Sequence, residues 1–164
     1  MKARGIWIIC LAVLLALPVA SRAQSKGHIK LTSVAEVEKE VFNAEGKKVV
    51  QRLPAAKVLP GSEVIFTTRY ENVSREKAEN AVITNPVPEH MLYKRSSAQG
   101  AGARVTFSVD NGKSYNIPSQ LFVMDAAGRK FPARPKDYTH IRWTFEKPLP
   151  SGAKGAVSFR AILK

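Results

Sequence analysis

The residues that most often carry chemistry are sparse in this sequence and are not grouped. The three histidines, His28, His90 and His140, lie far apart, and none belongs to a His-x-x-His or His-Glu-x-x-His pattern. A zinc site usually draws several ligands from such closely spaced positions. We therefore interpret the histidines as solvent-exposed and predict no metal, no cofactor and no catalytic residue. No Gly-x-Ser-x-Gly elbow and no phosphate-cradling Gly-Lys-Ser/Thr loop is predicted either.

Two short motifs favour turns over ligand sites. The sequence Asp110-Asn-Gly112 resembles part of a calcium loop but lacks the acidic ligands that follow downstream in such loops. Asn-Gly accepts positive φ at both turn positions, so the motif predicts a hairpin whose return strand is Ser114 to Ile117. Asn72-Val-Ser74 matches a glycosylation acceptor, which we interpret as a turn at the end of a strand.

Basic side chains are the most abundant groups that could bind a ligand. The chain has 26 Lys and Arg against 13 Asp and Glu, a formal net charge of +13. A basic exported protein attracts polyanions such as lipopolysaccharide phosphates, acidic glycans or nucleic acid. The alternative is a solvated surface that only aids solubility. The candidate polyanion-binding residues are Lys94, Arg95, Arg129, Lys130, Arg134 and Lys136.

Four of these cations belong to residues 125–137, a segment rich in Ala, Gly and Pro. Gly128, Pro132 and Pro135 disfavour a sheet ladder, so the segment is predicted to be an exposed, mobile loop. Phe131 lies between the cations and offers an apolar contact.

The start of the chain predicts export. Lys2 and Arg4 precede an apolar run over residues 6–20, and Ser21-Arg22-Ala23 follows with small residues at the cleavage positions. This order is typical of a signal peptide, residues 1–23. The run is short for a transmembrane helix, which needs about 20 apolar residues.

Cleavage would leave 141 residues (164 minus 23) with no integral membrane span, and we expect a periplasmic or otherwise exported protein. The lost segment contains Lys2, Arg4 and Arg22, so the formal net charge falls from +13 to +10. It also contains Cys10, the only cysteine, so the remaining domain must fold without a disulfide.

The elements that would position these residues are strands. Apolar and polar residues alternate through Val64, Phe66, Thr68 and Tyr70, and again through Ile141, Trp143 and Phe145. We expect Trp143 and Phe66 to be the principal core residues. Further strands are predicted over residues 29–37, 47–53, 81–87, 91–96, 105–109, 121–124 and 157–163. A helix over residues 34–41 is the alternative for the first, because Glu and Lys favour helices. About nine strands at this spacing predict an all-β, immunoglobulin-like β-sandwich.

Several motifs, in order, resemble the conserved repeat domain found in bacterial and archaeal surface proteins and known as domain of unknown function eleven. They are Pro60-Gly61 with Tyr70-Glu-Asn72, Ala78-Glu-Asn80 through Pro86-Val-Pro88, Tyr93 with Ser96-Ser97, Phe107 through Gly112, Asp137-Tyr138 through Trp143, and Leu149-Pro-Ser-Gly152 through Phe159. The resemblance spans residues 58–163 and implies an immunoglobulin-like sandwich with a cell-envelope role.

The resemblance also bears on organisation and function. Together with the predicted signal peptide, residues 1–23, it divides the chain into 24–57 as a strand or hairpin extension packing on the sandwich and 58–164 as the repeat domain. Family members usually occur as tandem modules, whereas a single copy predicts a stand-alone protein. We expect a non-enzymatic envelope protein that acts through protein or envelope contacts, with an envelope protein or an anionic envelope polymer as its partner. The alternative is a basic periplasmic or extracellular protein that binds lipopolysaccharide, an acidic glycan or nucleic acid.

Overall fold

The computed structural model describes residues 29–164, so the predicted signal peptide and His28 lie outside the described residues. Within that range the chain forms eleven strands and two 3₁₀ turns, which confirms the all-β prediction. The strands are β1 (Ile29–Phe42), β2 (Lys48–Pro54), β3 (Glu63–Asn72), β4 (Val82–Pro86), β5 (Met91–Tyr93), β6 (Gln99–Gly100), β7 (Ala103–Ser108), β8 (Phe122–Met124), β9 (Lys130–Pro132), β10 (His140–Phe145) and β11 (Lys154–Leu163). The 3₁₀ turns are η1 (Pro118–Gln120) and η2 (Pro135–Asp137).

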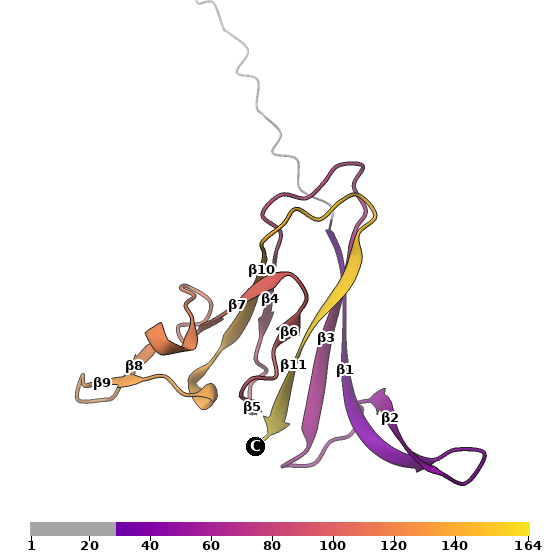
Figure 1. Ribbon diagram of the computed structural model, residues 1–164. Helices are drawn as coiled ribbons and strands as arrows, with labels where there is room; N and C mark the ends of the chain where they lie inside the picture. Colours follow the sequence, from indigo (N-terminus) through magenta and orange to yellow (C-terminus); the bar gives the residue numbers. More distant parts are fainter. Residues whose placement is uncertain (1–28) are drawn as a thin grey trace, which may run out of the picture.

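The strands form three antiparallel sheets (Figure 1). The largest has the order β2-β1-β3-β11-β5, and β6 also pairs with β11. A smaller sheet has the order β4-β10-β7, and β8 and β9 form a separate hairpin. Strands that are neighbours in the large sheet are therefore often far apart in sequence, as with β3 and β11.

The core lies between the large sheet and the β4-β10-β7 sheet. Alternation along β10 buries every second side chain, and Trp143 in its middle is 0% exposed, as predicted. Phe66 of β3 lies opposite Phe159 of β11, and their rings stack at a centroid distance of 4.9 Å. Trp143 reaches Phe159 from the opposite sheet at 6.4 Å. Burying such rings is the main stabilising contribution available to a domain of this type.

The strand predicted over residues 29–37 is confirmed, and the alternative, a helix over residues 34–41, is wrong, because β1 continues as one strand from Ile29 to Phe42. Its first half pairs with β3 and its second half pairs with β2. Glu36, Glu38 and Glu40 recur at period two and so share one face of the strand. Sheet pairing on both sides of β1 therefore outweighs the helix propensity of its Glu and Lys residues.

Two loop predictions also need correction. Residues 125–137 do not remain outside the ladders, since β9 pairs with β8 and places Lys130 opposite Met124. Gly128, at φ +77°, closes the turn between them. The return strand expected over Ser114 to Ile117 is reduced to a single bridge, from Asn116 to Phe107. The turn before it has positive φ at Asn111 and Gly112, as the Asn-Gly motif predicts.

Candidate functional site

The six predicted polyanion-binding residues do not form one patch. Lys94 and Arg95 follow β5, whereas the other four lie on or just after the β8–β9 hairpin. Lys94 turns toward the large sheet and pairs with Glu63 of β3. Arg95 instead lines a cavity together with Ala133 and Pro135, next to η2. The structure thus separates two neighbours in sequence and brings only Arg95 near the basic segment.

Half of these cations already have a carboxylate partner. Besides Lys94, Arg129 pairs with Asp125 at 2.7 Å, and Arg134 lies 3.9 Å from Asp137. Lys130 lies over the ring of Phe122 at 4.1 Å. Within residues 29–164, Arg95, Lys130 and Lys136 have no carboxylate within ion-pair distance. Only these three of the six therefore keep an uncompensated charge for a ligand.

The cavity beside Arg95 has a volume of about 490 Å³. Its wall includes Tyr93, Phe107 and Tyr138, and the last two rings stack at 4.6 Å. Burial raises the pKa of Tyr138, so this phenol stays neutral at physiological pH. The site offers an apolar wall, one cation and the hydroxyls of Ser96 and Ser119, which suits an anionic or amphipathic ligand.

A different surface stands out on the arm, defined here as β1 from Glu36 onward, the turn at residues 43–47, and β2. The arm projects from the body of the molecule on the side opposite the β8–β9 hairpin (Figure 1). Phe42 is 72% exposed and Val50 is 66% exposed, and Val49 is also exposed. Single exposed apolar residues are normal. These three all lie at the tip of the arm, Phe42 and Val50 on one face and Val49 on the other, and such a cluster is typical of a contact surface.

The two faces of the arm differ in character. The register places Val37 opposite Leu53 and Val41 opposite Val49, so one face is mostly apolar. The other face carries Glu38 opposite Arg52, and Glu40 forms an ion pair with Lys48. The charged face also carries Phe42, opposite Lys48, and Val50, opposite Glu40, whereas Val49 lies on the apolar face. The ion pairs favour this register, and the tip exposes apolar side chains on both of its faces.

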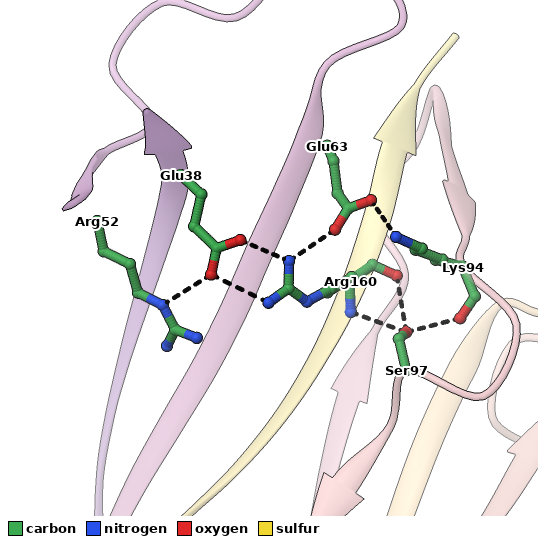
Figure 2. Close-up of polar contacts among 6 residues, drawn as sticks. All are labelled: Glu38, Arg52, Glu63, Lys94, Ser97 and Arg160. Carbon is green, nitrogen blue, oxygen red and sulfur yellow. Dashed lines mark hydrogen bonds and ion pairs between the residues drawn. The ribbon is translucent and has the colours of Figure 1, made fainter. Parts of the chain in front are cut away.

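An ionic network fixes the charged face of the arm to the body (Figure 2). Arg160 of β11 donates two hydrogen bonds of 3.0 Å to the carboxylate of Glu38 and a third, of 2.7 Å, to Glu63. Glu38 also accepts from Arg52 of β2, and Glu63 accepts from Lys94. The network therefore joins β2, β1, β3, β11 and the segment after β5.

The pKa values of the network follow from these bonds. The hydrogen bond from Arg160 lowers the pKa of Glu38, and the bonds from Lys94 and Arg160 lower the pKa of Glu63. The two carboxylates in turn raise the pKa of Arg160. Each of the three cations has a carboxylate partner and each of the two carboxylates accepts from two cations, so we interpret the network as an anchor for the arm and not as a reactive group.

The remaining motifs of the sequence have structural roles. The Asp110 carboxylate accepts bonds from Ser108 and Ser114, which lower its pKa and brace the hairpin turn. Gly112-Lys-Ser114 has the residue order that ends a phosphate loop, but its Ser114 hydroxyl donates to Asp110 at 2.6 Å. No group of His, Cys, Asp and Glu between residues 29 and 164 is arranged to hold a metal ion.

The glycosylation motif is likewise structural. Asn72 is 0% exposed, and its amide nitrogen donates to the carbonyls of Glu76, Leu149 and Pro150. Its oxygen accepts from Ser74. A side chain engaged in this way at the end of β3 is not available for modification in the folded protein.

Sequence reasoning missed the arm as a surface. Its signal was present in the apolar run Val49-Val50 after a turn, together with Phe42 before that turn. Neither pattern alone shows exposure, because the same residues would be buried if another strand covered them.

No family model, no curated protein and no solved structure matches this chain. Between Ile29 and Lys164, no helix has the length and apolar character needed to cross a membrane.

Proposed function

We propose that this chain is an exported, non-enzymatic cell-envelope protein, an immunoglobulin-like β-sandwich that acts through contacts with another protein. The observation that carries the proposal is the arm, whose tip exposes Phe42, Val49 and Val50. Its base is held to the body by the network around Arg160. A held arm loses little conformational freedom when a partner covers it, which favours binding.

Site-specific photocrosslinking tests this proposal in envelope extracts. A photoreactive residue at position 42 or 50 is compared with one at Val82 of β4, a matched control that is also exposed but lies in the other sheet. We expect a discrete protein adduct from the arm positions and none from Val82. The same adducts from all three positions, or none from the arm, would contradict the proposal.

The same preparation tests export. If residues 1–23 are removed, the protein recovered from the envelope begins at Gln24. A recovered chain that begins at Met1 would show that the leader is retained.

Polyanion binding remains a second candidate, supported by Arg95, Lys130 and Lys136, which have no carboxylate partner within residues 29–164. Their replacement by Ser is compared with replacement of the paired cations Lys94, Arg129 and Arg134 by Ser. Both variants lose the same formal charge. Retention on heparin or lipopolysaccharide at low salt should fall more for the first variant, because paired cations are already compensated. If both variants lose the same retention, binding depends on net charge alone, and specific polyanion binding by Arg95, Lys130 and Lys136 is refuted.

A further inference from the structure

The outer edge of β2 supports a more specific inference, which rests on the proposed function because it names an occupant for the same arm. We propose that β2 pairs with β2 of a second copy of this chain. The two strands run antiparallel, with Gln51 opposite Gln51 on the two-fold axis. The result is an isologous dimer, in which each copy presents the same surface to the other.

The free edge of β2 can be identified from the hydrogen-bond pattern of the arm. The Asn43 N–H donates to the Lys47 carbonyl, and the Ala55 N–H donates to the Ala35 carbonyl. Bonded and non-bonded pairs alternate in an antiparallel ladder, so the odd-numbered residues of β2 point their backbone groups at β1. The N–H and C=O groups of Lys48, Val50 and Arg52 therefore point away from the sheet, where β2 has no neighbour.

These outward groups restrict the registers that two copies can adopt. Bonded pairs must join even-numbered residues, because only those residues present backbone groups to the free edge. With Gln51 on the axis, Val50 exchanges both of its backbone bonds with Arg52 of the second copy. The two nearest registers that also bond even-numbered residues have Val50 or Arg52 on the two-fold axis. The first places Lys48 opposite Arg52 of the second copy, and the second places Arg52 opposite Arg52. Like charges directly opposite are destabilising, so the register centred on Gln51 is favoured.

The side chains of that register are also complementary. On the apolar face, Val49 lies opposite Leu53 of the second copy, which extends the apolar row that Val41 and Val49 begin on each arm. On the charged face, Lys48 and Arg52 are already paired with Glu40 and Glu38 of their own hairpin. The dimer therefore brings no uncompensated cations together.

The edge also lacks several devices that keep strands apart. Proline occurs only at Pro54, the last residue of β2, and the residues before it form a regular ladder with β1. The arm stands clear of the body, so a second copy can approach it (Figure 1). One strand pair is a small contact, in the class below about 1,200 Å² that forms weak, reversible complexes.

A disulfide at the axis tests the register. Gln51→Cys places two thiols in a non-bonded pair, where the Cα atoms are about 4.5 Å apart and a disulfide can form. Lys39→Cys is the matched control, because Lys39 lies opposite Gln51 on the same face of the arm. Its two copies would be three strand spacings apart, about 14 Å, which is too far. We expect oxidation to link the first variant and not the second.

Sedimentation equilibrium tests the edge itself. Val50→Pro removes an outward N–H and leaves the bonds to β1 intact, whereas Val50→Ala keeps that N–H. We expect a concentration-dependent dimer for the parent and for Val50→Ala, and a dissociation constant at least about tenfold higher for Val50→Pro.

The outcomes separate this inference from the proposed function. A chain that stays monomeric up to about 1 mM, or crosslinks equally at positions 39 and 51, overturns the dimer. If arm-dependent adducts with another envelope protein persist in that case, the proposed function stands. If the protein dimerises but gives no adduct with another envelope protein, the β2 pairing stands and the proposed contact with an envelope partner is refuted.

Discussion

Gly100 provides a sharp test of the core, because it is the point where β6 touches the buried indole of Trp143. A Cβ atom at this position would lie 2.6 Å from Cδ1 of Trp143 and 3.0 Å from Cγ1 of Val157. Gly100 is not among the residues with positive φ, so a substitution there is opposed by overlap and not by backbone strain. Trp143 is 0% exposed and packs in the core, so its ring cannot turn outward into solvent to avoid the overlap. We expect Gly100→Ala to cost about 1–3 kcal/mol of the free energy of unfolding.

A double-mutant cycle isolates the cause. Trp143→Phe shortens the ring that Gly100 contacts, and it removes an indole nitrogen that has no hydrogen-bond partner. In that background Gly100→Ala should cost clearly less, with a coupling of about 0.5–3 kcal/mol. Trp143→Ala alone should cost about 3–5 kcal/mol. Denaturant midpoints and slopes give the free energy of unfolding of the parent, the two single variants Gly100→Ala and Trp143→Phe, and the double variant. Equal costs of Gly100→Ala in both backgrounds would refute the reasoning that steric contact with Trp143 is what excludes a side chain.

Two other substitutions test the polar contacts. Glu63→Gln should lower the free energy of unfolding by about 1 kcal/mol at neutral pH. The pKa of Glu63 is depressed in the folded state, so the difference between the two proteins should be complete above the ordinary pKa of 4.5. The difference should vanish as the pH falls through the depressed pKa. A difference that is unchanged at acid pH would contradict the ionic origin. Asn72→Ala should cost about 1–3 kcal/mol, because it removes three hydrogen bonds from a buried amide and leaves the Ser74 N–H without its acceptor. Asn43, a half-buried turn residue, should tolerate Ala better. Equal thermal midpoints for the two variants would argue against a buried amide.

The strands that form the core could be predicted because their signal is local. In β10, apolar Ile141, Trp143 and Phe145 alternate with polar neighbours, and the structure buries all three. The same is true of Val157, Phe159 and Ala161 in β11. A period of two is written into consecutive residues and needs no knowledge of the partner strand.

The first strand of the β8–β9 hairpin was predicted over residues 121–124, but β9 was missed because the turn before it was interpreted as part of a loop. The Asp125 carboxylate accepts from the backbone of Ala127 and Arg129, and Gly128 supplies the positive φ that closes the turn. An Asp followed three residues later by Gly is a recognisable turn pattern. Pro132 does not prevent the pairing, because it is the last residue of β9 and lies at the end of a two-stranded ladder.

The distribution of charge could not have been predicted, because it depends on register between strands that are distant in sequence. Glu38 and Arg160 are 122 positions apart, yet pairing through β3 places them on the same face of the large sheet. Lys94 and Arg95 are adjacent in sequence, yet one joins that network and the other lines a cavity near η2. The count of 26 basic residues therefore overstates the number of unpaired cations that a polyanion would meet. What remains for a partner is decided by which cations the fold has already paired, and this is why the apolar tip of the arm is the better-supported contact surface.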